Sequence, residues 1–211
     1  MYSQCLRHCG EVENKTRGFM KNGLVLITGP KHSGKSMAAL ALEKITGGEA
    51  LDLDEIVERQ TGKKVRELFR EGSEIFREAE ARALSSLIRL KVQDEKLRII
   101  ATGGGIIDNP EAMALLAGCR EIVTVYLDVS PETAWVRILR SAAGSDTCTT
   151  ATGELPPFLN TENPRETHLA LHKRRAEAYK ALASLTISAE NKSPEEIAGE
   201  IAERLELPAN L

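Results

Sequence analysis

An eight-residue stretch near the start of the chain has the residue types and the spacing of a phosphate-binding loop. The stretch from Gly29 to Ser36 is GPKHSGKS, in which four residues separate the first glycine from Gly34, Lys35 and Ser36. In such a loop, backbone N–H groups hold phosphate oxygens, the lysine reaches the β- and γ-phosphates, and the serine hydroxyl binds Mg²⁺. Because an apolar run precedes the loop and a helical pattern follows it, the sequence predicts a site for nucleotide phosphates and magnesium.

The predicted nucleotide contacts extend one residue beyond this loop. They are Gly29, Lys31, Ser33, Gly34, Lys35, Ser36 and Met37. Lys31 and His32 are unusual residues in the middle of a phosphate loop. The Lys31 ammonium is either a solvated charge or a second cation near the phosphates, and both interpretations stay open.

Two aspartates, Asp52 and Asp54, lie in the next predicted strand. An aspartate at Asp52, next to the phosphate loop, could hold Mg²⁺ through water, since this ion keeps several waters. If extended backbone continues through Asp54, both side chains lie on the same side of it, and Asp54 could orient or deprotonate an attacking alcohol. The alternative is that Asp54 only caps a helix that begins at Glu55.

Three consecutive glycines and two arginines complete the candidate site. Gly103, Gly104 and Gly105 follow a third apolar run, where glycine lets the backbone approach a ligand closely, although a flexible turn is the alternative. Arg77 and Arg175 lie in predicted helices, where lone arginines are usually solvated. If both point into one cleft, they could clamp a carboxylate in a bidentate way.

These residues must be positioned by strands that alternate with helices along the chain. Apolar runs predict strands at 24–28, 49–55, 98–105, 121–129 and 185–189. Helical patterns are found at 36–45, 55–60, 65–70, 73–91, 165–183 and 194–205, and prolines start further helices at 110 and 131. This alternation predicts a three-layer α/β/α domain with a five-stranded parallel sheet. Ligands bind at the carboxyl ends of such strands, so the loops form one site.

Composition favours a single enzyme-like domain. The chain has 211 residues, a net charge of −3 and a pI near 5.9, which argues against a nucleic-acid partner. It has no apolar stretch long enough for a membrane span, and residues 1–22 are polar and irregular. We therefore expect a tail at 1–22 and one domain at 23–211. The four cysteines lack zinc-site spacing, which indicates reduced thiols in the cytoplasm.

Four segments resemble the shikimate kinase family in their order and spacing. They are GPKHSGKS at 29–36, DLDEIVERQTGKKVRELFREGSEIFREAEARAL at 52–84, IIATGGGII at 99–107 and NPRETHLALHKRRAEAYKALA at 163–183. The resemblance implies a phosphate-loop kinase fold with strand order 2-3-1-4-5, a mobile lid at about 141–164, and a monomer. It also implies ATP-dependent phosphorylation of the 3-hydroxyl of shikimate, giving shikimate 3-phosphate for chorismate and aromatic amino-acid biosynthesis.

The resemblance also implies a role for each matching residue. Lys35 and Ser36 would serve the ATP phosphates and Mg²⁺, with Asp52 as a further magnesium carboxylate. Asp54 would hold the shikimate hydroxyls, Arg77 and Arg175 would grip its carboxylate, and Gly103 to Gly105 would line the acceptor site. Arg140 and the loop from Lys192 to Pro194 match the segments that sandwich adenine.

The lid segment departs from the family pattern. The family has an arginine before the sequence PLL that supports the transferring phosphoryl group, whereas this chain has Pro156 in LPPFL and no lysine or arginine from 141 to 164. Such an arginine can be worth roughly 10³–10⁵ in rate. Lys31, Arg140 and Arg165 are the candidate replacements. The alternative function is a shikimate kinase-like protein with weak turnover, or a kinase for another carboxylated polyol.

Overall fold

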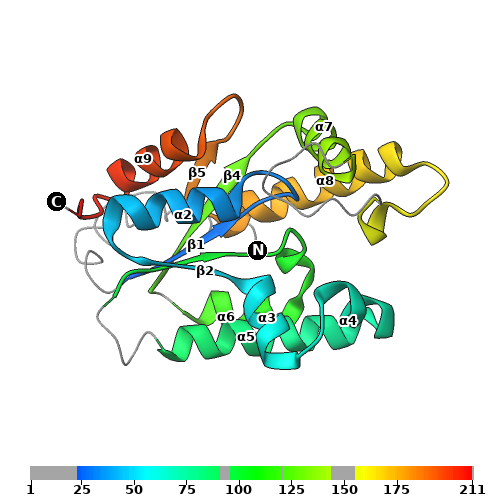
Figure 1. The fold of residues 1–211 in the computed structure, drawn as a ribbon, viewed down its shortest axis with the longest axis horizontal. Helices are drawn as coiled ribbons and strands as arrows, with labels where there is room; N and C mark the ends of the chain where they lie inside the picture. The colour runs from blue at the N-terminus through cyan, green and yellow to red at the C-terminus, as the bar shows by residue number, and fades with distance from the viewer. Residues whose placement is uncertain (1–22, 91–95, 120, 144–154, 211) are drawn as a thin grey trace, which may run out of the picture.

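The computed structural model describes residues 23–90, 96–119, 121–143 and 155–210, and the predicted tail lies outside them (Figure 1). Its strands are β1 (Leu24–Thr28), β2 (Glu49–Asp52), β3 (Arg98–Ala101), β4 (Ile122–Asp128) and β5 (Leu185–Ser188). They pair in parallel in the order β2-β3-β1-β4-β5. The predicted five-stranded parallel sheet and its strand order are therefore confirmed.

The helices follow the strands as the sequence indicates. They are α2 (Lys35–Thr46), α3 (Leu53–Thr61), α4 (Val65–Glu71), α5 (Ser73–Leu90), α6 (Pro110–Gly118), α7 (Pro131–Ala142), α8 (Pro164–Leu182) and α9 (Pro194–Arg204), with short 3₁₀ turns η3 (Ile106–Asp108) and η4 (Pro157–Leu159). A proline opens each of α6, α7, α8 and α9, where its missing N–H costs no helical hydrogen bond. Asn109, Ser130 and Ser193 cap α6, α7 and α9 by accepting a backbone N–H bond.

The sheet is the middle of three layers, because its central strand is buried on both faces. Val25 and Ile27 of β1 pack into one core with α2 and α9, and Leu24 and Leu26 pack into the other with α3, α5 and α6. Figure 1 shows α2 and α9 on one side of the sheet and α5 and α6 on the other. On the latter side, Tyr179 of α8 stacks on Tyr126 of β4 with ring centroids 5.1 Å apart.

Two predicted boundaries are wrong. The second strand ends at Asp52, and helix α3 begins at Leu53, two residues earlier than expected. The Asp52 carboxylate accepts a bond from the Asp54 backbone N–H at 3.0 Å, so Asp52 and not Asp54 caps this helix. In the predicted lid, α7 continues to Ala142 and η4 follows Pro156, while residues 144–154 lie outside the described ranges.

The sequence also raised expectations about cysteines, metal ligands and membrane spans. Cys119 is a free thiol, and the remaining three cysteines lie outside the described residues. Within the described ranges, no group of three or more histidines, cysteines and acidic residues is arranged to hold a metal ion. None of the described helices has the length and apolarity that crossing a membrane requires.

Candidate active site

The phosphate loop closes on itself between β1 and α2. The Lys35 ammonium donates to the Pro30 carbonyl at 2.8 Å across the loop, and Lys35 is only 8% exposed. Burial, and then the charge of Lys31, lowers the pKa of Lys35 to about 8. No acidic residue lies in the first turn of α2, so the positive end of this helix faces the loop without a competing carboxylate. The loop therefore offers backbone N–H groups, a helix terminus and a buried cation to phosphate.

Ser36 at the start of α2 and Asp52 at the end of β2 meet at the same edge of the sheet, although β3 separates β2 from β1, the strand that precedes α2. The Ser36 hydroxyl donates to the Asp52 carboxylate at 2.7 Å. Both groups present oxygen, which is the ligand type that Mg²⁺ prefers in proteins. This hydroxyl–carboxylate pair beside a phosphate loop fits the predicted magnesium position.

Asp54 lies deeper in the site than Asp52. Burial, and then the negative charge of Asp52, raises the pKa of the Asp54 carboxyl above its usual range. Its Oδ1 is buried and has no hydrogen-bond partner in the described structure. The charges of Lys31 and Lys35 lower the pKa of Asp54, but by less than burial and Asp52 raise it.

The glycine loop after β3 contacts both of these groups closely. A Cβ on Gly103 would lie 3.0 Å from Asp54 Oδ1, and a Cβ on Gly104 would lie 3.0 Å from the Lys31 backbone nitrogen. A contact of 3.0 Å is tighter than nine in ten real Cβ contacts, so a side chain at either position would make its neighbour shift by a few tenths of an ångström. The three loops that the sequence predicted to share one site are thus in contact.

Glu80 is a site residue that the sequence reasoning missed. It is 1% exposed, and a Cβ on Gly103 would lie 3.3 Å from its Oε1, an atom with no hydrogen-bond partner. Its Oε2 accepts from Asn109 at 2.9 Å, and burial raises its pKa to about 7. The available signal was its position three residues after Arg77, which places both side chains on one face of α5.

Arg175 is held against the glycine loop. It bonds the Asp108 carboxylate at 2.6 Å and the Gly104 carbonyl at 2.9 Å, and its side chain is 15% exposed. Tyr179 donates to the same carbonyl at 2.6 Å, so α8 fixes this loop at two points. The Phe158 ring of η4 lies 5.9 Å from the Arg175 guanidinium.

The side chain of Arg77 is more exposed than that of Arg175. Its guanidinium pairs with Glu74, one turn earlier on α5, at 2.7 Å, and its side chain is 37% exposed. Both arginines nevertheless lower the pKa of Glu80 through their charge, Arg175 more than Arg77. The two predicted acceptor arginines are therefore brought to the same buried carboxylate from different helices.

Comparisons with known proteins agree with this geometry. A family model described as shikimate kinase matches residues 31–206. The shikimate kinase of Moorella thermoacetica is 34% identical over 184 residues, which are 87% of this chain and 94% of that protein. The shikimate kinase of Thermobifida fusca is 35% identical over 187 residues, 88% of this chain and 95% of that protein. The chain belongs to the shikimate kinase family.

Solved structures support the family assignment. The shikimate kinase from Acinetobacter baumannii in complex with shikimate has a TM-score of 0.71, with 26% identity over 90% of this chain and 96% of that one. A shikimate kinase from Bacteroides thetaiotaomicron, 24% identical, shares the fold with a TM-score of 0.69. Membership of the shikimate kinase family makes the protein an enzyme, a kinase that uses ATP.

The remaining predicted contacts concern adenine. Arg137, one turn before Arg140 on α7, donates to the His32 carbonyl of the phosphate loop and to the Ala189 carbonyl after β5, each at 3.2 Å. Arg140 is exposed in the last turn of α7. Lys192 pairs with Glu200 of α9 at 2.5 Å. The arginine that joins the phosphate loop to the loop before α9 is therefore Arg137, which the sequence reasoning missed.

Proposed function

We propose that the protein transfers the γ-phosphoryl group of ATP to the 3-hydroxyl of shikimate, giving shikimate 3-phosphate and ADP. The observation that carries the proposal is the position of Asp54. Its buried carboxylate lies between the lysines of the phosphate loop and Gly103, beyond which Glu80 and the two arginines gather. A phosphoryl donor on one side and a polar, carboxylate-binding pocket on the other is the arrangement that this reaction needs.

On the donor side, Lys35 and the loop N–H groups would hold the β- and γ-phosphates, and Ser36 and Asp52 would hold Mg²⁺. The ion, when bound, neutralises charge on the phosphate oxygens. Because Lys35 is buried, its charge acts in a site with little water, where electrostatic stabilisation is stronger than in solvent. Arg137, placed between the phosphate loop and the loop before α9, is the better candidate than Arg140 for the adenine side.

On the acceptor side, Asp54 would accept the proton of the attacking hydroxyl or orient it. A raised pKa makes a carboxylate a better proton acceptor, and the burial that raises the pKa of Asp54 therefore suits this role. Arg77 and Arg175 would bind the carboxylate of shikimate, since guanidinium groups match carboxylates in bidentate pairs. The proposed working form is a monomer in the cytoplasm.

The second candidate function rests on the lid. No lysine or arginine occurs from 141 to 164, which favours either weak turnover with shikimate or another carboxylated polyol as acceptor. In both cases the site would keep the arginine clamp and Asp54. The choice between the functions is therefore one of rate and acceptor identity.

A coupled assay of ADP release, with and without shikimate, tests the proposal. We expect shikimate-dependent ADP release and a product with the mass of shikimate 3-phosphate. Lys35→Ala should abolish turnover in a protein with an unchanged circular dichroism spectrum, whereas Lys44→Ala, an exposed lysine of the same helix, should not. ADP release that shikimate does not stimulate, but another carboxylated polyol does, would establish the second function instead.

A further inference from the structure

The transferring phosphoryl group needs a cation that the chain does not supply from its lid segment. Phosphoryl transfer concentrates charge on the equatorial oxygens, and kinases neutralise it with arginine, lysine or metal. Since residues 141–164 contain no lysine or arginine, any cationic side chain that adds to the charge of the metal must come from elsewhere in the chain. The question rests on the proposed function, and four described residues are candidates: Lys31, Arg137, Arg140 and Arg165.

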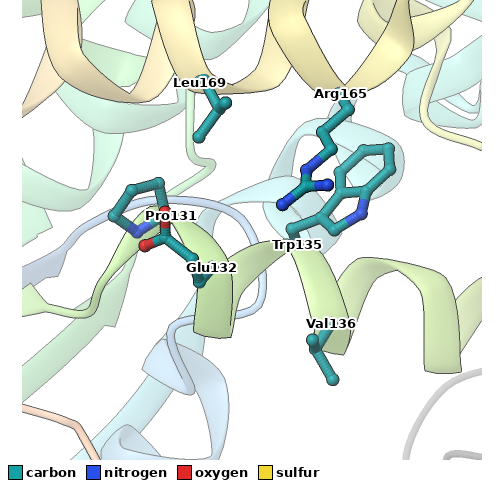
Figure 2. A pocket seen from close by; sticks show the side chains of 6 residues that line it. All are labelled: Pro131, Glu132, Trp135, Val136, Arg165 and Leu169. Carbon is teal, nitrogen blue, oxygen red and sulfur yellow. The ribbon is translucent and has the colours of Figure 1, made fainter.

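Arg165 is directed elsewhere. In Figure 2 its side chain extends from α8 toward Trp135 on α7, into a pocket that Pro131 and Leu169 also line. The pocket, of about 80 Å³, lies between the two helices and is much smaller than the roughly 300–1,000 Å³ of typical ligand sites. Arg165 therefore covers the contact between α7 and α8.

The arginines of α7 fit the role no better. Arg140 is exposed at the end of the helix. Arg137 is close to the phosphate loop, but its two terminal nitrogens donate to the carbonyls of His32 and Ala189. Those bonds hold two loops together, and breaking them to reach a phosphate would release both.

Lys31 has the position that the role requires. Its backbone packs on the glycine loop, since a Cβ on Gly104 would meet the Lys31 nitrogen at 3.0 Å and its Cα at 3.4 Å. Its charge acts on Lys35, which would hold the donor phosphates, and on Asp54, which would face the acceptor hydroxyl. The residue thus lies at the junction of the donor and acceptor halves of the site.

The surroundings of the Lys31 ammonium differ from those of a solvated lysine. The residue as a whole reaches solvent, but desolvation of the ammonium lowers its pKa below the usual value. Asp54 opposes this effect, and Arg66 adds to it.

We propose that Lys31 stabilises the negative charge on the transferring γ-phosphoryl group and so replaces the arginine that the lid segment lacks. During the step the acceptor hydroxyl oxygen bonds to the γ-phosphorus, and the bond from that phosphorus to the β–γ bridging oxygen breaks. The bridging oxygen leaves with the electron pair as part of ADP, and the hydroxyl proton goes to the Asp54 carboxylate. Lys31 remains protonated throughout and acts by charge alone.

Steady-state kinetics of Lys31→Met and Lys31→Arg test this role. Removing one hydrogen-bond donor that is already positioned to stabilise charge in the transition state typically lowers kcat by roughly 10²–10³-fold. Lys31→Met should lose that much in kcat with little change in the KM for shikimate, because the contact is made in the transition state. Lys31→Arg should recover most of the loss, and Lys44→Met, which removes an exposed lysine of α2, should behave as the parent.

A binding measurement separates contacts made in the transition state from contacts made in the ground state. Because ADP lacks the γ-phosphoryl group, calorimetry at constant pH should give Lys31→Met and Lys31→Arg an ADP affinity near that of the parent. This binding arm works without an acceptor, so it still tests the position of Lys31 if shikimate is not phosphorylated and the proposed function fails.

Three results would overturn the inference. One is a kcat for Lys31→Met within about twofold of the parent, which would mean that Lys31 adds nothing to the chemical step. Another is a raised KM for ATP with kcat unchanged, which would assign Lys31 to ground-state phosphate binding. The third is an equal loss in Lys31→Arg and Lys31→Met, which would mean that charge is not the property that matters.

Discussion

The carboxylates of Asp54 and Glu80 converge on Gly103 from different helices. A Cβ on this glycine would lie 3.0 Å from Asp54 Oδ1 and 3.3 Å from Glu80 Oε1, and neither oxygen has a hydrogen-bond partner in the described structure. Burial first, and the charge of Asp54 in addition, raises the pKa of Glu80 to about 7. Two acidic groups in one buried place do not both ionise readily, so the site holds a proton near neutral pH.

This shared proton predicts that Glu80→Gln stabilises the protein in a pH-dependent way. The carboxyl has a pKa of 4.5 in the unfolded chain and about 7 in the fold, so the folded protein binds the extra proton between these values. The free energy of unfolding of the parent should therefore fall as pH rises from 4.5 through 7, by roughly 3 kcal/mol. Glutamine cannot ionise and can still accept from Asn109, so Glu80→Gln should lack this decline.

Urea denaturation of both proteins at about pH 5 and about pH 8 measures the effect. The gain from Glu80→Gln should be small at the lower pH and large at the higher one. Glu78→Gln is the matched control, because Glu78 is exposed on the same helix, where it pairs with Arg82. An equal gain at both pH values would mean that Glu80 is ionised in the fold.

The close contact of Gly104 with Lys31 predicts that one added methyl group at Gly104 lowers activity. In Gly104→Ala the Cβ would meet the Lys31 backbone nitrogen at 3.0 Å and its Cα at 3.4 Å, and backbone cannot move aside as a flexible side chain does. We expect kcat/KM for ATP to fall, by less than the roughly hundredfold that a displacement of about 1 Å in a catalytic group can cost, since this contact needs a shift of a few tenths of an ångström. Gly118→Ala, where nothing lies within 4 Å, should leave activity unchanged. Normal kinetics in Gly104→Ala would show that the phosphate loop tolerates displacement.

The arginines from α5 and α8 predict a selective loss of acceptor binding. Arg77→Ala and Arg175→Ala should each raise the KM for shikimate by roughly ten- to a hundredfold, because a hydrogen bond to a charged group is worth about 1.5–3 kcal/mol. Each variant should change the KM for ATP little. Arg175→Ala should also lower the melting temperature, since the Arg175 guanidinium bonds Asp108 and the Gly104 carbonyl, whereas the Arg77 guanidinium pairs with the exposed Glu74.

Arg174→Ala is the control for this pair. Arg174 bonds the same Asp108 but is 62% exposed. Its removal should leave the KM for shikimate near that of the parent. Calorimetry that shows unchanged shikimate binding in both Arg77→Ala and Arg175→Ala would place the acceptor carboxylate elsewhere.

The fold was predictable because the sequence signals for it are local. Apolar runs such as 24–28 predict buried strands, and prolines and glycines punctuate the helices, so the positions of β1, β3 and β4 follow from the chain itself. The strand order came from the family resemblance, because periodicity does not say which strands pair. The phosphate loop was predictable for the same local reason, since its spacing is nearly sufficient to define its function.

Site details that depend on tertiary contacts were not predictable. Arg137 and Arg140 are one turn apart on the same helix, and only the packing of α7 shows that Arg137 reaches the His32 carbonyl. Asp52 and Asp54 both suit a helix N-terminus, and the choice depends on where the strand ends. The role of Glu80 depends on burial, which places a carboxyl with a pKa of about 7 beside Gly103. In each case the residue type was visible in the sequence but its partner was not.

Glu190 joins the loop after β5 to helix α7. Its carboxylate accepts from the Ser130 backbone N–H at 2.5 Å and from the Thr133 hydroxyl at 2.8 Å. The bond from Ser130 is the main cause that lowers the pKa of Glu190 below its usual 4.5. The negative charge of this carboxylate also interacts favourably with the positive N-terminal end of α7, the helix that carries Arg137. Glu190 is thus a helix cap supplied from a distant part of the chain.

Glu190→Ala should therefore lower the free energy of unfolding by about 1 kcal/mol, within the 0.5–2 kcal/mol that cap removal costs. Because the folded pKa is depressed, this contribution is fully present above pH 4.5 and is lost as pH falls through the lower, folded value. Denaturation at a series of pH values from neutral downward should then show a difference between parent and variant that shrinks toward acid pH. Glu203→Ala, which removes an exposed glutamate of α9, should show no difference at any of these pH values. The KM for ATP should rise in Glu190→Ala and less in Glu190→Gln, since glutamine keeps an acceptor for Ser130. Equal stability of Glu190→Ala and the parent at neutral pH would mean that Ser130 alone is a sufficient cap for α7.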